Sequence, residues 1–338
     1  MLTTLSDLPA TLNETYARIL QRVPQSDVPL AYEALTWLAF STRPLRLQVL
    51  SEAMVLHDSD RYLDDDCRLS NPNDALDICV GLAQVDDGYV TLAHDSIRSF
   101  LTSSWIRTSP VAHFALESTR ANRQILRKCL SYLSFYEFEQ GYVTSEGELT
   151  ARLEKYPLLE YAATFWPDHL IADPPDPRDE KLILDFFATK ANPGGGCFES
   201  WVQFLLMSLD IEAIRRTEPL YYAASYNMVP ILKILLKPGS GVDVNRPGGR
   251  FGSTPLAIAC FRGYTEAATV LLEAGADPNV SDGGTHRSAY SLAKHRNMHD
   301  VVRLMEELGV NLKRNPPRVR AIWSKSGRFR QNPPQYDT

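Results

Sequence analysis

Two groups of residues in this 338-residue chain have types and spacing that could support catalysis or metal binding. The first is His94, Asp95 and Ser96, which are the three residue types of a hydrolytic triad but are consecutive in the chain. A triad is assembled from distant positions, because adjacent side chains diverge. The G-x-S-x-G turn that presents a nucleophilic serine does not occur in the sequence either. The sequence therefore predicts no catalytic residue.

The second group is the pair His295 and His299, whose spacing of four could place both imidazoles on one helix face as metal ligands. Residue 296 is Arg rather than the Glu of the H-E-x-x-H motif, and no third ligand is near. Asn297 lies between the histidines and marks an expected turn, so we expect solvent-exposed turn histidines and no metal. The five cysteines are scattered and never in C-x-x-C spacing, which predicts a reducing compartment, the cytoplasm, without disulfides.

The charge of the chain is divided unequally. Residues 313–338 contain seven basic residues and one acid, a net +6, whereas the whole chain carries −6, so residues 1–312 carry −12. The basic tail is rich in proline and poor in apolar residues, which predicts disorder. An acidic body repels nucleic acid and anionic membranes. No apolar run approaches the roughly 18 residues of a membrane span, so we expect no membrane contact.

Apolar residues that recur at spacings of three and four predict that the N-terminal third is mostly helical. One hairpin is also predicted there. Thr11 and Glu14 form a capping-box signature, and Asp86–Gly88 reads as a tight turn between two strands. Three helices, a two-stranded wing and a further helix are the order of a winged-helix module. Its predicted recognition helix carries acids and no Lys or Arg, so we expect no DNA binding.

Several segments carry a family resemblance. Residues 8–16 (LPATLNETY), 34–40 (ALTWLAF), 92–101 (LAHDSIRSFL) and 156–170 (YPLLEYAATFWPDHL) are similar to segments that follow the nucleotide-binding NACHT module in fungal NLR-like (STAND) proteins. The resemblance covers nearly all of residues 5–312. It implies a winged helix of the type also named for GPI inositol-deacylase, and a receptor that serves non-self recognition and cell death.

The resemblance also implies a role for His94, which matches the histidine that contacts the β-phosphate of ADP in such switches. That role needs a docked nucleotide domain. The phosphate-binding loop G-x-x-x-x-G-K-[ST] requires a Gly-Lys dipeptide, which is absent from this sequence. We therefore expect no bound cofactor, and expect His94 to cap or pack at the end of its strand.

The last third is a repeat array. The run 218–224 (EPLYYAA) matches 254–260 (TPLAIAC) at a spacing of 36 residues, and 288–293 (SAYSLA) is a weaker third copy 34 residues further on. This is the ankyrin pattern. Asn227 and Gly263 are predicted to form the turns between paired helices. The long loop of the first copy contains Arg246, Arg250 and Phe251, the residue types that anchor protein interfaces, so we predict that they contact a partner.

The sequence thus predicts a mostly α protein: a winged helix, a helical connector and a short ankyrin-repeat solenoid. The predicted boundaries are 1–106, 107–215 and 216–312, followed by the basic tail 313–338. The predicted function is non-enzymatic protein binding through the ankyrin repeats, in a fragment resembling the regulatory half of a fungal NLR-like receptor. The alternatives are an inositol-deacylase-like hydrolase fragment and a nuclear scaffold that contacts nucleic acid through its basic tail.

The missing phosphate loop gives a first prediction. Calorimetric titration of this chain with ADP or ATP is expected to give no heat of binding at micromolar concentrations. A stoichiometric heat that His94→Ala abolishes would contradict it.

Overall fold

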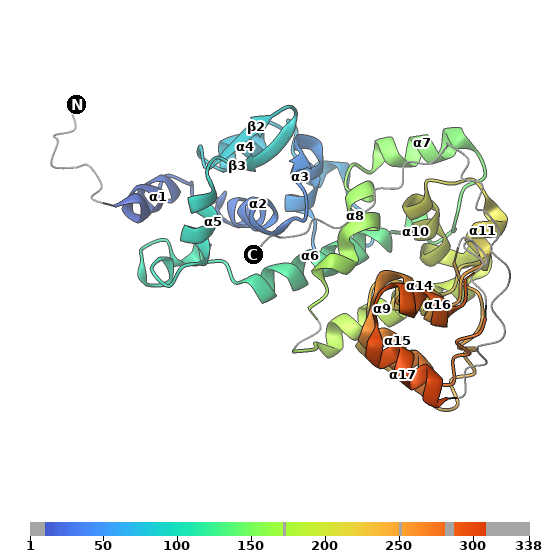
Figure 1. The fold of residues 1–338 in the computed structure, drawn as a ribbon. Coiled ribbons are helices and arrows are strands. Elements are labelled where there is room, and N and C mark those ends of the chain that lie inside the picture. Colours follow the sequence, from blue (N-terminus) through green and yellow to red (C-terminus); the bar gives the residue numbers. More distant parts are fainter. Residues whose placement is uncertain (1–10, 172–173, 250–251, 281–286, 309–338) are drawn as a thin grey trace, which may run out of the picture.

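The computed structural model describes residues 11–171, 174–249, 252–280 and 287–308. The chain is mostly helical, as predicted, with one small sheet near its N-terminus and a stack of helices that ends in ankyrin repeats (Figure 1). The predicted basic tail lies outside the described residues. Within the described ranges, no helix has both the length and the apolar character to cross a bilayer.

The N-terminal unit contains five helices and three strands. These are α1 (Leu12–Leu20), α2 (Val28–Phe40), β1 (Leu45–Arg46), α3 (Leu47–Val55), α4 (Asp74–Ile78), β2 (Ala83–Asp86), β3 (Tyr89–Leu92) and α5 (Asp95–Thr102). The predicted capping box begins α1: the Glu14 amide donates to Thr11 Oγ1 and the Thr11 amide donates to the Glu14 carboxylate, both at 3.2 Å. These bonds satisfy amides that the first helical turn leaves unpaired.

The sheet has one strand more than the sequence predicts. Its order is β1-β3-β2 and both pairs are antiparallel, with Leu45 and Val85 each facing Val90. Asp87 and Gly88 form the two-residue turn with positive φ angles of 48° and 77°, as a tight hairpin requires. Strand β1 is not predicted from the sequence, because two residues are too few for an alternating pattern and only their pairing with β3 makes them a strand.

Helix α2 is buried between two apolar clusters. Ala31 and Leu35 face α1, α5 and the turns that follow α5. Ala34 and Trp37 face the opposite way, into a cluster that extends without interruption to Met305 in the last helix. The N-terminal unit and the repeats are therefore joined by one core.

In the described ranges, twelve helices follow α5. They are α6 (Ser118–Leu133), α7 (Glu146–Lys155), α8 (Leu159–Phe165), α9 (Pro177–Ala188), α10 (Gly196–Leu206), α11 (Ile211–Arg216), α12 (Pro219–Ser225), α13 (Val229–Leu235), α14 (Pro255–Arg262), α15 (Thr265–Glu273), α16 (Ala289–His295) and α17 (His299–Glu307). Short 3-10 turns lie at Asp65–Cys67, Ile106–Thr108, Ala112–Phe114, Tyr136–Phe138, Trp166–His169, Thr189–Ala191 and Pro193–Gly195.

Ten of these helices form two parallel rows. Row A consists of α8, α10, α12, α14 and α16, and row B consists of α6, α9, α13, α15 and α17; neighbours within each row pack together (Figure 1). Each row A helix also packs on a row B helix, from the α6–α8 pair to the α16–α17 pair. The helices between the N-terminal unit and the repeats therefore extend the same stack on the N-terminal side of the repeats.

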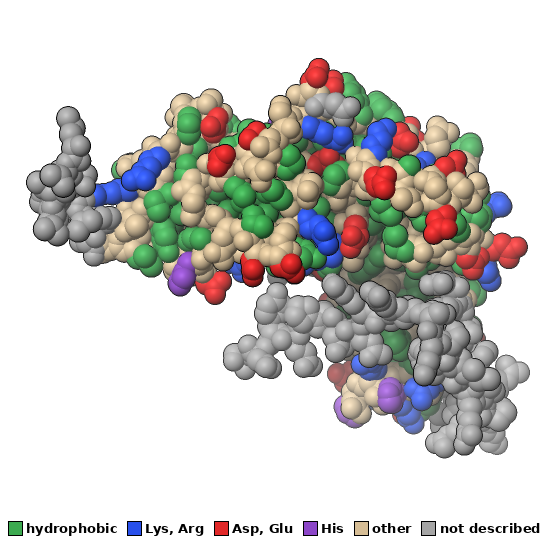
Figure 2. All heavy atoms as spheres, turned by 90° about the horizontal axis from the view of Figure 1, so that it is seen from above, with side chains coloured by type: hydrophobic (Ala, Val, Ile, Leu, Met, Phe, Trp, Pro, Cys, Tyr) green, Lys and Arg blue, Asp and Glu red, His purple; other side chains and the backbone are tan. Residues whose placement is uncertain are grey.

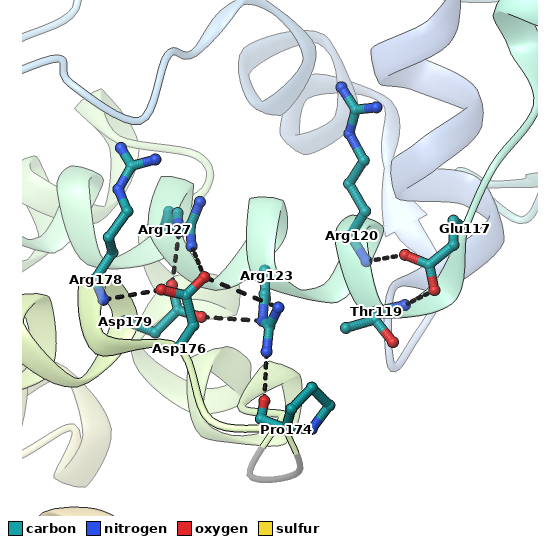
Figure 3. A network of polar contacts seen from close by, with 9 residues as sticks. All are labelled: Glu117, Thr119, Arg120, Arg123, Arg127, Pro174, Asp176, Arg178 and Asp179. Atoms are coloured by element: carbon teal, nitrogen blue, oxygen red, sulfur yellow. Dashed lines mark hydrogen bonds and ion pairs between the residues drawn. The ribbon is translucent and has the colours of Figure 1, made fainter.

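Partly buried ion pairs join the first two helices of row B. Figure 3 shows Arg123 and Arg127 of α6 pointing toward Asp176 and Asp179 at the beginning of α9. Arg127 donates to Asp179 Oδ1 at 2.6 Å and to Asp176 Oδ2 at 2.8 Å, while Arg123 Nε lies 3.4 Å from Asp179 Oδ2. Burial raises the pKa of Asp179, and the two arginines oppose that shift. Removing one partner would leave a buried charge unpaired, which is costly.

Aromatic rings join the connecting helices to the repeats. The Trp201 indole of α10 is fully buried, and its ring centroid lies 5.8 Å from that of Trp166 and 4.8 Å from that of Tyr222 in α12. Its Nε1 donates to the Ala163 carbonyl of α8 at 2.8 Å. A single side chain thus contacts three successive helices or turns of the stack.

Trp201→Ala is expected to reduce the free energy of unfolding by about 3–5 kcal/mol, because the substitution leaves a cavity and an unpaired carbonyl. Chemical denaturation followed by circular dichroism measures this loss. Trp105→Ala, at a side chain 36% exposed, is the matched control and should cost much less. Equal losses in the two variants would contradict the assignment of Trp201 as the junction of the stack.

Candidate protein-interaction surface

Three helix pairs form the repeats, and their ends follow from local sequence. Thr254 Oγ1 accepts from the Ala257 amide at the start of α14, and Ser288 Oγ accepts from the Ser291 amide at the start of α16, both at 3.2 Å. The turns within the pairs use left-handed residues, with φ of 54° at Asn227, 84° at Gly263 and 57° at Asn297. The turns predicted at Asn227, Gly263 and Asn297 are confirmed, and they set the helices antiparallel within each pair.

The loops between pairs are built alike and bonded to each other. Asp243 Oδ1 accepts from the Asn245 amide at 2.9 Å, and one repeat later Asp277 Oδ1 accepts from the Asn279 amide at 2.8 Å. Asn245 Oδ1 in turn accepts from the Asp277 amide at 2.7 Å. Successive loops therefore project side by side from the same edge of the stack, as ankyrin loops do.

The base of the long first loop is fixed against α12. The Gly248 amide donates to the Ser253 carbonyl at 3.0 Å, and the Gly248 carbonyl accepts from the Glu218 amide at 3.1 Å. A Cβ on Gly249 would stand only 2.5 Å from the ring of Tyr221. Glycine is needed here because the backbone passes directly over that ring.

Of the three predicted partner-binding residues, the structure describes only Arg246. Arg246 is exposed, and its Nε pairs with Glu218 Oε1 at 2.9 Å across the loop base. Burial raises the pKa of Glu218, and Arg246 opposes that shift. Arg250 and Phe251 lie outside the described residues. The role of all three residues in binding therefore stays a prediction.

Phe261 on α14 is a further candidate contact residue that was not predicted from the sequence; its side chain is 44% exposed. The Arg296 guanidinium lies over its ring, 5.4 Å from the centroid. A signal was present in the sequence: Phe261 falls off the stripe of Leu256 and Ala259, which are buried. A large apolar side chain off the buried stripe of a helix is a candidate contact residue.

His94 caps the helix that follows it. Its Nδ1 accepts from the Ser96 amide at 3.1 Å at the start of α5. Ser96 Oγ lies 2.7 Å from the same nitrogen and 2.7 Å from Tyr16 Oη, so the hydroxyl connects the cap to α1. This geometry explains a histidine at that position without a nucleotide.

The remaining histidine and cysteine candidates are dispersed. His295 ends α16 and His299 begins α17, both exposed, on either side of the Asn297 turn. Among the residues that the structure describes, no three His, Cys, Asp or Glu side chains are grouped to hold a metal ion. All five cysteines are free thiols, and burial raises the pKa of Cys79 and of Cys260 to about 12. Thiols with such pKa values are poor nucleophiles.

A buried histidine takes part in a chain of hydrogen bonds between helices. His169 is fully buried; its Nε2 lies 2.8 Å from Tyr161 Oη and its Nδ1 lies 2.9 Å from Asn122 Oδ1. Tyr161 Oη also accepts from the Thr42 amide at 3.1 Å. These bonds are satisfied by a neutral imidazole that carries its proton on Nδ1. Burial lowers the pKa of His169 to about 4.

A buried carboxylate similarly joins α3 to α6. The Tyr132 hydroxyl donates to Glu52, and Arg68 Nε lies 3.0 Å from the other carboxylate oxygen. Burial raises the pKa of both Glu52 and Tyr132. Both side chains are almost fully enclosed, so this cluster acts in packing rather than on a solute.

Comparison with known proteins identifies the repeats. The family described as ankyrin repeats (3 copies) matches residues 194–282, a span that includes α10 and α11 as well as the first two helix pairs. The azaphilone pigments biosynthesis cluster protein L of Monascus ruber is 29% identical over 300 residues, which cover 81% of this chain and 61% of that protein. This chain therefore spans less than two thirds of that relative.

Other similarities are shorter. The palmitoyltransferase AKR1 of Lachancea kluyveri is 37% identical over 73 residues, covering 22% of this chain and 10% of that protein. The ankyrin repeat and SOCS box protein 6 of Mus musculus is 31% identical over 119 residues, covering 35% of this chain and 28% of that protein.

The burial of His169 predicts a pH dependence of stability. Its pKa falls from 6.5 to about 4 on folding, so the unfolded chain binds the proton more tightly. Stability from this group is complete above pH 6.5 and is lost as the pH falls toward 4. The contribution to the free energy of unfolding that is lost between pH 7.5 and pH 5 is about 2 kcal/mol.

Urea denaturation of wild type and His169→Gln at both pH values should show a shallower pH dependence of stability in the variant. His299→Gln, at an exposed site, should retain the wild-type dependence, and equal slopes in all three proteins would refute the prediction.

Proposed function

We propose that this chain is a non-enzymatic protein-binding module whose partner contacts the ankyrin repeats. The observation that carries the proposal is the match to ankyrin repeats, a domain type that serves protein interaction. The parallel loops and the exposed Arg246 and Phe261 support it, because arginine and aromatic side chains are common interface anchors.

We further propose that the N-terminal unit is a winged helix, in a protein like the regulatory half of a fungal NLR-like receptor. The order of α2, β1, α3, α4 and the β2–β3 hairpin supports the winged helix. The similarity to a Monascus ruber protein over most of the chain supports a fungal source. Non-self recognition and cell-death signalling in the cytoplasm are what this resemblance implies.

Protein contact is a better role for the N-terminal unit than DNA contact. Its helix α4 contains Asp74 and Asp77, while Asp86 ends β2 and Asp87 lies in the hairpin turn. These carboxylates would face phosphate groups if the unit bound DNA as many winged helices do.

Site-specific photo-crosslinking tests the proposal on the full chain. A photo-reactive benzoylphenylalanine replaces Arg246 in the repeat loop, or Val85 on β2, in protein expressed in cells of the source organism. We expect a protein adduct from position 246 and none from position 85, whose side chain is 45% exposed. An adduct from position 85 alone would move the binding surface to the N-terminal unit and overturn the proposal.

The first-repeat loop can then be tested with that partner. Arg250→Ala combined with Phe251→Ala is expected to weaken binding about tenfold or more, because both residue types are frequent anchors. Lys237→Ala with Val242→Ala is the control, since it removes one cation and one apolar side chain from the same connection. Equal binding by the two double variants would contradict a role for the loop.

A further inference from the structure

Acidic residues are segregated between the two helices of the second and third repeats. The row A helices α12, α14 and α16 contain no acidic residue, whereas α15 and α17 together contain five. Those five acids are Glu266, Glu273, Asp300, Glu306 and Glu307. The part of row A that the repeats contribute, α12, α14 and α16, therefore carries no carboxylate within its helices.

Exposed cations gather at the C-terminal ends of α14 and α16. We call Phe261, Arg262, Lys294, His295 and Arg296 the basic strip; all five side chains are exposed. At the repeat end of the molecule, Figure 2 shows histidine side chains next to Lys and Arg side chains. The strip combines three permanent charges and one histidine with an aromatic ring.

Arg296 is held in place across two repeats. Its Nε donates to the Phe261 carbonyl at 2.7 Å, and its guanidinium covers the Phe261 ring. Its two terminal nitrogens have no hydrogen bond or ion pair with any described residue. A guanidinium positioned in this way can bind a carboxylate through two parallel hydrogen bonds with little loss of side-chain entropy.

Nearby acids only partly neutralise the strip. Lys294 Nζ lies 3.9 Å from Glu306 and 4.6 Å from the centre of the Tyr290 ring. Asp168, in the turn after α8, interacts with Arg262 over a longer range: burial raises the pKa of Asp168 and Arg262 opposes the shift. In the described part of the chain, Arg262 forms no ion pair. Positive charge thus remains at Arg262 and Arg296.

We propose that the basic strip binds an acidic segment of a partner protein, with an apolar residue of that segment on Phe261; this inference rests on the proposed function of the repeats. Charge complementarity supports it, because the strip is a cationic surface on a body that carries −12 over residues 1–312. That net charge disfavours long polyanions such as nucleic acid, whose affinity depends on many phosphate contacts. A short segment with several carboxylates avoids most of this repulsion.

The test uses a phage-displayed library of random 12-residue peptides selected on the full chain. Enriched peptides are expected to carry several Asp or Glu residues and one aromatic or branched aliphatic residue. The best peptide is synthesised with fluorescein and measured by fluorescence anisotropy. Arg262→Glu and Arg296→Glu should each weaken binding about tenfold or more, and higher NaCl should weaken binding to wild type. Arg303→Glu on α17 is the matched control and should leave affinity unchanged, because that side chain lies on the opposite row.

Melting curves identify any variant that fails to fold, and Arg262→Gln provides a milder second variant that should show a smaller loss. The inference is overturned if enriched peptides lack acids, or if charge reversal leaves binding unchanged. It is equally overturned if oligothymidylate binds more tightly than the peptide through the same residues, or if sedimentation shows self-association that the reversals abolish. A partner that is crosslinked at position 246 and still binds Arg262→Glu and Arg296→Glu would refute binding of an acidic segment by the basic strip. The proposed function of the repeats would then remain intact. Crosslinking at position 85 alone would instead refute the proposed function.

Discussion

Trp201 lies where the two rows of helices pass from the connecting helices into the ankyrin repeats, and its ring meets aromatic rings on both sides. Its neighbours include Trp166, Phe187 and Tyr222. A repeat stack needs a covered end, since each repeat buries its apolar face only against a neighbour. Here the covering is made by α8, α9 and α10, and the aromatic contacts make that end part of the same core.

Buried charges define which helices pair. Lys128 of α6 is almost fully buried and lies 2.6 Å from Glu33 of α2, while Arg127 on the same helix reaches Asp179 of α9. Such pairs add little net stability, but a shifted helix would bury an unpaired charge at a cost of several kcal/mol, about 3–5. The apolar residues of α6 could pack against their neighbours in several ways. The ion pairs of Lys128 and Arg127 favour the observed arrangement.

Local features of this fold could be predicted from the sequence, and its long-range pairings could not. The Thr11 and Thr254 caps, the Asn227 and Gly263 turns and the repeat period depend on a few neighbouring residues, so single segments encode them. Strand β1 and the packing of α9 on α13 depend on partners far along the chain. For the candidate surface, the loop residues were predicted, whereas the stacking of Arg296 on Phe261 required knowledge of how adjacent repeats align.

The two-row arrangement has a consequence for how the chain acquires its structure. From α8 onward, each helix packs on at least one helix that precedes it, and α6 itself packs on α2. During synthesis the N-terminal part of a chain folds first. The helices that are made early can therefore provide a packing surface for the helix pairs that follow. The repeat helices follow α6, α8, α9 and α10 in the chain, so they can assemble on helices that have already been made.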